Sequence, residues 1–369
     1  MALAASAQNR EYHFSRLNVD SGLSNNDTTE EVITLNYYKL NTEENPAKPG
    51  YGFYRVFLRR RNSEHIFYVM HPPNRDFEHF CLPKSRKNRD GFGNPTQNVV
   101  DAFPMVDGRP ISESSALFPY NPQDPYANRD PRFRYSIIYN TANWFSTTTN
   151  SEIPVFTYMG AQTDGFYQDP GAAEASGYFS RKMLVEGLTA NFGTADRNWP
   201  LIRYAEILLI KAEALNELNR TSKAYAPIRE IRRRTSIITG TDGNYGMQAG
   251  TTRENMRSFI QNERRIELFD EDNRCDDVRR WKLATTLFHN KYNKLMSPTK
   301  VPVSAEFPTG YKYEVVNSLR LHTFKEKKNL PPFETGEMLS NTALIQNPGW
   351  QPNTNYGELL TNHTIVIIY

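Results

Sequence analysis

Histidines, cysteines and acids are the residues of this sequence that could carry catalysis or hold a metal, and their spacing decides between these roles. His71 and His79 flank two acidic residues and lie just before Cys81, so a metal site or a Cys–His nucleophile could be assembled there. Neither arrangement has the spacing of a metal-ligand set. The sequence also lacks the GxSxG, Walker A, HExxH and GxGxxG motifs. We therefore expect no metal, no cofactor and no catalytic residue, although the many acids leave a glycosidase pair as an alternative.

An acidic run in the second half of the chain is the other candidate for metal binding. Asp270-Glu271-Asp272 is followed by Asp276-Asp277, and no glycine lies between Asp270 and Asp277. A calcium loop needs a glycine for its sharp turn, so this pattern argues against calcium. The interleaved Arg274, Arg279 and Arg280 instead predict ion pairs.

Aromatic side chains are concentrated in one irregular stretch of the chain. Between residues 118 and 179 there are fourteen dispersed rings, and Asn-Pro and Asp-Pro pairs interrupt any regular period. Tyr and Trp present flat apolar faces with a polar handle, which suits stacking on sugar rings or holding peptide side chains. A long loop-rich stretch is often functional. From composition we select seven candidate ligand contacts: Tyr139, Trp144, Phe145, Tyr158, Phe166, Tyr167 and Tyr178.

The overall composition excludes several classes of protein. The 369 residues contain 44 Lys+Arg and 41 Asp+Glu, and a net charge of +3 gives no general attraction to nucleic acid. Hydrophobic residues make up only 38% of the chain, but 12% aromatics are typical of a folded protein and not of a disordered one. There is no apolar run of 18 residues, and two cysteines are too few for a disulfide scaffold.

Regular elements that could position these rings are predicted on either side of the irregular stretch. Residues 53–58 and 65–70 are apolar runs typical of buried elements, and Thr96 is a plausible N-cap for a short helix. From residue 201 an apolar face recurs at helical spacing, with Pro200 expected in the first turn. This pattern predicts a helical hairpin over 201–236. Thr251 and Glu254 have the spacing of a capping box that opens a third helix.

Six blocks of the sequence resemble, in order, those of the SusD/RagB family of nutrient-binding outer-membrane lipoproteins of Bacteroidota. The resemblance covers roughly residues 53–350. The blocks are Pro95–Phe103 (PTQNVVDAF), Asn128–Phe133 (NRDPRF), Asn198–Glu217, Asn262–Leu268 (NERRIEL), Asp277–Trp281 (DVRRW) and Gln346–Trp350 (QNPGW).

The resemblance implies a mainly α fold with long irregular loops, in which tetratricopeptide-type helical hairpins support a loop-rich, ligand-facing half. It predicts one domain over 1–369, with the ligand-facing region at 95–197 and the helical scaffold at 198–290. It implies a non-catalytic protein on the outer-membrane surface that delivers oligosaccharides to a SusC-like TonB-dependent transporter. Within the motifs, it implies a set of buried ion pairs and hydrogen bonds made by Arg203, Glu206, Glu213, Glu263, Arg264, Arg265, Glu267, Arg279 and Arg280.

The sequence departs from the family pattern at three places. The family usually begins with a lipoprotein signal, an anchoring cysteine and about three helical hairpins, so the resemblance predicts a chain truncated at its N-terminus. Cys275 stands where the family usually has an aromatic, and residues 351–369 run past the usual end of the family without explanation. A peptide ligand, a glycoside hydrolase and a purely structural partner of the transporter are the alternatives to glycan binding.

Overall fold

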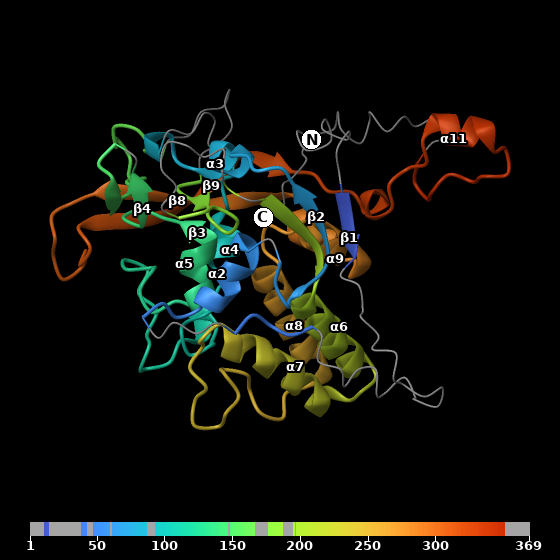
Figure 1. Cartoon of the computed structure of the whole chain (residues 1–369), viewed down its shortest axis with the longest axis horizontal. Helices are drawn as coiled ribbons and strands as arrows, with labels where there is room; N and C mark the ends of the chain where they lie inside the picture. The colour runs from blue at the N-terminus through green and yellow to red at the C-terminus, as the bar shows by residue number, and fades with distance from the viewer. Residues whose placement is uncertain are drawn as a thin grey trace.

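The computed structural model describes residues 11–14 (backbone only), 38–42, 47–59, 61–86, 93–146, 148–166, 176–186, 195 and 197–350. Helices predominate and the sheets are small, which confirms the predicted mainly α fold with long loops (Figure 1). The tail at 351–369, which runs past the usual end of the family, lies outside the described residues. Among the described helices, none combines the length and the apolar character needed to cross a membrane.

The helical half is built by the successive helices α6 (Tyr204–Glu217), α7 (Thr221–Arg234), α8 (Arg253–Glu267), α9 (Asn273–Arg280) and α10 (Ala284–Phe288). Of these, α6, α7 and α8 lie in the lower part of Figure 1 and α9 lies above them. Ala212 on α6, Ile228 on α7 and Ile260 on α8 meet in one fully buried apolar cluster. The predicted helical hairpin over 201–236 is therefore confirmed as α6 and α7.

Two predicted helix starts are wrong by a few residues. Residues 201–203 and Pro200 belong to strand β7 (Arg197–Arg203), which pairs antiparallel with β2 (His65–His71) and places Pro200 opposite Tyr68. In the described sheet β7 has a strand on one side only, and an edge strand tolerates a proline. The N-cap of α8 is Thr252, whose side chain accepts a hydrogen bond from the Asn255 backbone N–H, so Glu254 falls in the first turn and not at a capping-box position.

The other half consists of short elements joined by long loops. Around β2 lies a three-stranded sheet in the order β1-β2-β7, and three two-stranded sheets follow. Thr96 does precede α4, although its side chain makes no capping hydrogen bond. The elements are β1 (Glu11–Phe14), α2 (Tyr51–Leu58), α3 (Asp76–Cys81), α4 (Gln97–Val100), α5 (Pro131–Ser136), β3 (Ile137–Ile138), β4 (Asn143–Ser146), β5 (Ser151–Pro154) and β6 (Phe179–Ser180).

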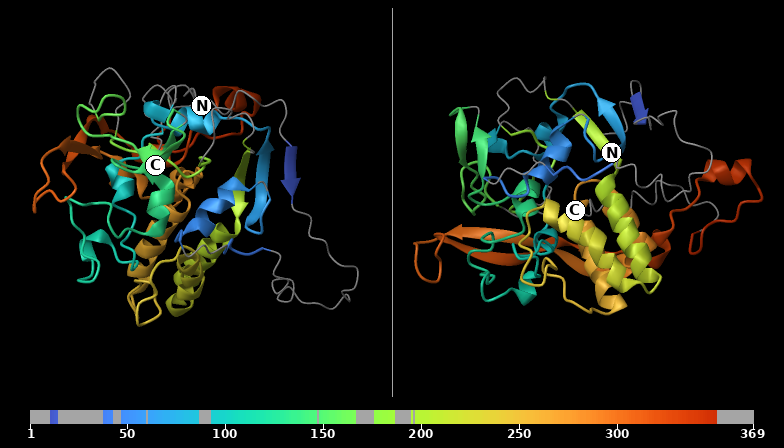
Figure 2. Two further views of the ribbon diagram at one scale, coloured as in Figure 1. Left: turned by 60° about the vertical axis from the view of Figure 1, so that its left-hand side comes forward. Right: turned by 60° about the horizontal axis from the view of Figure 1, so that its bottom comes forward.

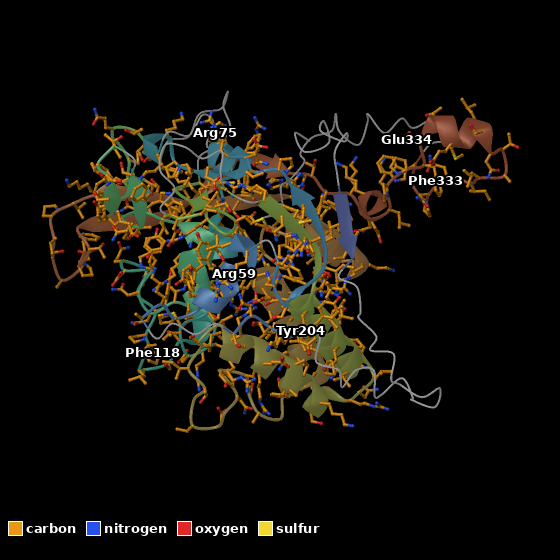
Figure 3. The ribbon with its side chains drawn as sticks, in the orientation of Figure 1. Arg59, Arg75, Phe118, Tyr204, Phe333 and Glu334 are labelled. Carbon is orange, nitrogen blue, oxygen red and sulfur yellow. The ribbon has the colours of Figure 1, made fainter. Side chains whose placement is uncertain are left out.

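A long antiparallel ribbon and an arm complete the fold. The ribbon is formed by β8 (Lys291–Lys300) and β9 (Tyr311–His322), and its Met296, Tyr311 and Tyr313 enter the aromatic core beside Phe103 and Phe133. The arm runs from the turn Glu326–Asn329, which contacts α10, through α11 (Thr335–Ser340) to Trp350, and α11 lies apart from the rest of the molecule (Figures 2 and 3). Figure 3 shows Phe333 and Glu334 on this arm, far from Tyr204 at the start of α6.

A buried network of charges joins the helical half to the other elements. Arg132 on α5 pairs with Glu263 and Glu267 on α8 at 2.8 and 3.0 Å, and Arg203 at the end of β7 pairs with Glu267 at 2.8 Å. Five cations and five anions, each with a side chain at most 2% exposed, make up this network: Arg132, Lys182, Arg203, Arg232, Arg234, Glu64, Asp130, Glu263, Glu267 and Glu271. Because the charges balance, the network has no uncompensated buried ion.

The expected ion pairs of the sequence blocks form, with two qualifications. Arg264 pairs with Asp277 at 2.8 Å and with Glu206 at 3.4 Å. Arg280 pairs with Glu213 at 2.6 Å, but this guanidinium is 43% exposed, so the pair lies at the surface. Arg265, Arg274 and Arg279 form no side-chain hydrogen bond or ion pair with any described residue, and the prediction is wrong for these three.

Asp270, just after α8, gives a testable pH dependence. Burial raises the pKa of this carboxyl to about 6, against the hydrogen bond donated by Ser180. Between about pH 4 and 6 the folded state therefore binds more protons than the unfolded state, and stability falls as pH rises through that window. Asp270→Asn should abolish this fall and make the protein more stable than wild type at pH 7.5. Asparagine also tolerates the positive φ of 62° at this position.

Urea unfolding at pH 4.5 and 7.5 measures this effect. Asp276→Asn, on the exposed side of α9, is the matched control and should keep the wild-type pH dependence. An Asp270→Asn protein with the same pH dependence as wild type would contradict the assignment.

Candidate ligand-binding site

A pocket of about 310 Å³ opens where α5, the β4–β5 hairpin and the segment after β6 meet. It brings together three of the seven candidate rings, Tyr139, Trp144 and Phe145, although they were chosen from composition alone. Eight further residues line the pocket, and five of them are charged. These eight residues are Lys48, Arg134, Tyr135, Ala142, Asn143, Glu152, Arg181 and Glu186.

Local sequence explains how α5 presents its side chains to the pocket. Asp130 caps the helix by accepting a hydrogen bond from the Arg132 backbone N–H at 2.8 Å, and Pro131 occupies the first helical position. In this one and a half turns Arg132 and Phe133 point into the core, whereas Arg134 is exposed. The N-cap of α5 and the buried side chain of Arg132 therefore fix the direction in which the Arg134 side chain points.

The register of the β4–β5 hairpin separates two neighbouring aromatics. Trp144 lies opposite Ile153, and Phe145 lies opposite Glu152. Directly opposite residues share a face of an antiparallel pair, so Trp144 turns into the core while Phe145 and Glu152 share the other face. Trp144 is 3% exposed and packs in an apolar cluster, whereas Phe145 is half-buried.

Arginines stack on the aromatic rings of the pocket. The guanidinium of Arg181 lies 5.0 Å from the centre of the Trp144 ring and 5.7 Å from that of Tyr135. Arg134 lies 4.7 Å from the Tyr135 ring centre and donates a hydrogen bond to the Tyr135 hydroxyl at 2.7 Å. Cations over aromatic faces at this range attract the rings. Trp144 therefore supports the pocket as a wall beneath Arg181, and its ring is not an open platform.

Burial and charge set the ionisation of these groups. Arg181 forms an ion pair with Glu186, and burial lowers the pKa of its guanidinium. Burial raises the pKa of the Tyr139 hydroxyl, so this phenol is neutral at physiological pH and can both donate and accept a hydrogen bond. The pocket thus combines rings with groups that donate to or accept from hydroxyls.

The remaining four candidate rings lie elsewhere. Tyr158 contacts Tyr311 with ring centres 5.6 Å apart, Phe166 is buried, and Tyr167 lies outside the described residues. Tyr178 is fully buried, and its hydroxyl donates to Gln97 Oε1 at 2.6 Å. The faces of the Phe166 and Tyr178 rings are covered by the core, so neither ring is available for contact with a ligand.

Charged residues of the pocket were missed by the sequence analysis. Arg134 directly follows the NRDPRF block within the predicted ligand-facing region, and that adjacency is the signal that could have identified it. Glu152 could have been identified only from its pairing with Phe145, and Arg181 only from the three-dimensional contact with Trp144.

The other candidate chemistries find little support in the described part of the chain. No group of three or more His, Cys, Asp or Glu side chains there is arranged to hold a metal ion. Burial raises the pKa of the Cys81 thiol far above its usual range, so Cys81 is not a thiolate nucleophile at neutral pH.

Comparison with known proteins adds independent information. The model of the SusD family matches residues 22–350. SusD-like protein P2 of Formosa agariphila is 31% identical over 145 residues, which are 39% of this chain and 27% of that protein. SusD-like protein P38 of the same organism is 34% identical over 104 residues, 28% of this chain and 19% of that protein. The chain thus matches about a quarter or less of the length of these curated relatives.

Solved structures resemble the fold over most of the described chain. A SusD-like protein from Bacteroides fragilis has a TM-score of 0.64 at 24% identity, over 87% of this chain and 60% of that one. A SusD-like carbohydrate-binding protein from the same species has a TM-score of 0.57 at 23% identity, over 81% of this chain and 56% of that one. At these identities the likeness concerns the fold.

Proposed function

The chain belongs to the SusD family, and on that premise we propose that it binds oligosaccharides without transforming them. The observation that carries the proposal is the pocket, in which half-buried aromatic rings stand next to exposed hydrogen-bonding groups. Pockets of about this volume with a few convergent polar groups are typical of small-ligand sites. The structural neighbour described as carbohydrate-binding supports the same class of ligand.

In the proposed complex, Phe145 and Tyr139 contact the apolar face of a sugar ring. Arg134 and Asn143 donate hydrogen bonds to its hydroxyls, and Glu152 accepts them. When a sugar binds at such a site, hydrogen bonds to water are replaced by hydrogen bonds to the protein. Each replacement therefore contributes little net free energy of binding. We therefore expect affinities from millimolar to micromolar, which correspond to about 4–8 kcal/mol.

We further propose that this binding takes place at the cell surface and serves delivery of the ligand to a SusC-like TonB-dependent transporter. The family membership supports this role, and a peptide ligand is the alternative within the family. An array of glycans and peptides, probed with the purified folded chain, distinguishes the two ligand classes. Co-purification with a SusC-like transporter tests the partner.

Glycoside hydrolysis is the competing function for the same pocket. It requires two carboxyls across the scissile bond, and Glu152 and Glu186 are the carboxylates available there. Glu186 is already paired with Arg181, which favours a structural role for it. Release of labelled products from a bound oligosaccharide would establish hydrolysis, and binding without release supports our proposal.

Phe145→Ala tests the pocket with the least disturbance of the fold. Loss of one stacking face should weaken oligosaccharide binding about tenfold, because such contacts contribute ~0.5–1.5 kcal/mol beyond the buried area. The half-buried position predicts only a small change in stability. Phe156→Ala is the matched control, since Phe156 is 41% exposed and lies outside the pocket. Equal affinities of the two variants by calorimetry would refute the assignment of the site.

A further inference from the structure

Two arginines on neighbouring helices carry positive charges that form no ion pair with any described acid. Arg265 on α8 and Arg274 on α9 have Nε atoms that are buried and make no hydrogen bond. Neither side chain forms an ion pair within the described part of the chain, and both residues are half-buried. We propose that Arg265 and Arg274 form a binding site for an oxyanion, separate from the aromatic pocket.

Apart from Arg279, the other arginines with buried side chains in the described chain have acceptors within the protein. Arg132, Arg203 and Arg232 each bind at least one carboxylate, at 2.6 to 3.0 Å. Arg129 has no carboxylate partner, but it donates hydrogen bonds to the carbonyls of Pro125, Val100 and Phe103. The fold thus supplies acceptors to buried guanidinium groups elsewhere, and at Arg265 and Arg274 it leaves the acceptor to come from outside.

Contacts between the helices hold the two arginines in place. Arg264, the residue before Arg265, pairs with Asp277 of α9 at 2.8 Å. Asn262, one turn earlier, donates a hydrogen bond to the Ala102 carbonyl at 2.9 Å and so ties α8 to the end of α4. These contacts fix α8 against α9 and α4, so the site is preformed and a ligand need not order it.

The positive charge of Arg274 acts on the guanidinium group of Arg265. Burial lowers the pKa of Arg265 to about 9, and the nearby charge of Arg274 contributes in the same direction. Burial also lowers the pKa of Arg274, to about 10. Both groups stay protonated at pH 7, and an anion between them would relieve their repulsion. Asp101 is the acid whose charge acts on Arg265, but it forms no ion pair with it.

The chemistry of the site selects its ligand class. Guanidinium groups bind planar or tetrahedral oxyanions through paired N–H donors. Asp101 acts on Arg265 and Asp277 acts on Arg274, but neither acid forms an ion pair with these two arginines. Two unpaired guanidinium groups suit a sulfate ester, a carboxylate or a free phosphate or sulfate ion. All of these ligands present an oxyanion, and experiment must identify which of them the protein binds.

Thermal unfolding at constant ionic strength tests the site with inorganic sulfate replacing chloride. We expect a saturable rise in Tm for the wild-type chain, and at least a tenfold higher midpoint concentration for Arg265→Gln and for Arg274→Gln. Arg233→Gln on the exposed side of α7 should keep the wild-type response. Sulfate stabilises proteins generally by exclusion from their surface, and that effect is neither saturable nor changed by these substitutions.

Further titrations identify the source of the anion. Acetate, phosphate, galactose 6-sulfate and galacturonate replace sulfate in the same experiment, and a sugar-borne anion that saturates at lower concentration than the free ions indicates an acidic saccharide. Removal of an unpaired charge leaves no orphaned acid, so both variants should fold. A wild-type response that is not saturable, or one that both glutamine variants share, would overturn the proposal.

Discussion

Glu267→Gln is expected to lower the free energy of unfolding by about 3–5 kcal/mol, because it leaves buried cations without their shared anion. Glu267 accepts hydrogen bonds from Arg132 Nη1 at 3.0 Å and from Arg203 Nη1 at 2.8 Å, and it also pairs with Arg234. Glutamine keeps the size of the side chain but loses its charge. Three fully buried guanidinium groups would then face a neutral amide.

The same residue predicts acid lability. The guanidinium groups of Arg234, Arg203 and Arg132 outweigh the opposing effect of burial and hold the pKa of Glu267 well below its usual range. A carboxyl with a lowered pKa stabilises the fold above its unfolded pKa of ~4.3, and this stabilisation is lost as pH falls toward the folded value. Wild type should therefore lose stability below about pH 4, and Glu267→Gln should show a shallower loss.

Urea denaturation followed by circular dichroism measures both effects. Glu217→Gln is the matched control, because Glu217 pairs with Arg257 at 2.6 Å but both side chains are more than a third exposed. Exposed pairs contribute ~0–1 kcal/mol. Losses of similar size in the two variants would show that the buried network adds nothing beyond a surface pair.

The helical half was predictable because its signals are local. An apolar face at 3.6-residue spacing identified α6 and α7 from their own sequences. The start of α6 was misplaced because Arg197–Arg203 pairs with a strand more than 120 residues earlier, and such pairing overrides helix propensity. No local pattern around Pro200 could reveal that partner.

The loop-rich half was predictable only in composition. The ring-rich stretch at 118–179 supplies most residues that line the pocket, but a stretch without a regular period cannot say which rings face inward. Trp144 and Phe145 are adjacent aromatics, and only the register of β4 against β5 assigns one to the core and the other to the pocket. Arg181 reaches Trp144 from a distant segment, which composition does not show.

The predictions of ion pairs were wrong where the tertiary structure, and not the spacing in the sequence, decides which acid an arginine contacts. Arg264 and Arg265 are adjacent in the NERRIEL block, so a sequence pattern treats them alike. On a helix they point about 100° apart, and only Arg264 faces Asp277. The unpaired arginine therefore became visible only in three dimensions.

Trp144→Ala is expected to act on both stability and binding. Trp144 is buried among Ile138, Val155 and Leu184, and truncation of a buried Trp typically costs 3–5 kcal/mol. The Arg181 guanidinium would also lose the ring that it covers. Because Arg181 lines the pocket, its release should weaken oligosaccharide binding at least tenfold in protein that is still folded.

Trp144→Phe separates the two effects, since phenylalanine refills most of the cavity and keeps a face for Arg181. We expect it to recover most of the stability lost in Trp144→Ala and to bind more tightly than the alanine variant. Calorimetric titration below the melting temperature, with unfolding curves for each variant, gives both quantities. If the measured binding decreases only in proportion to the fraction of folded protein, Trp144 is a core residue without a role in binding. Affinity that falls in folded Trp144→Ala and returns in Trp144→Phe would assign the ring the task of holding Arg181 at the ligand.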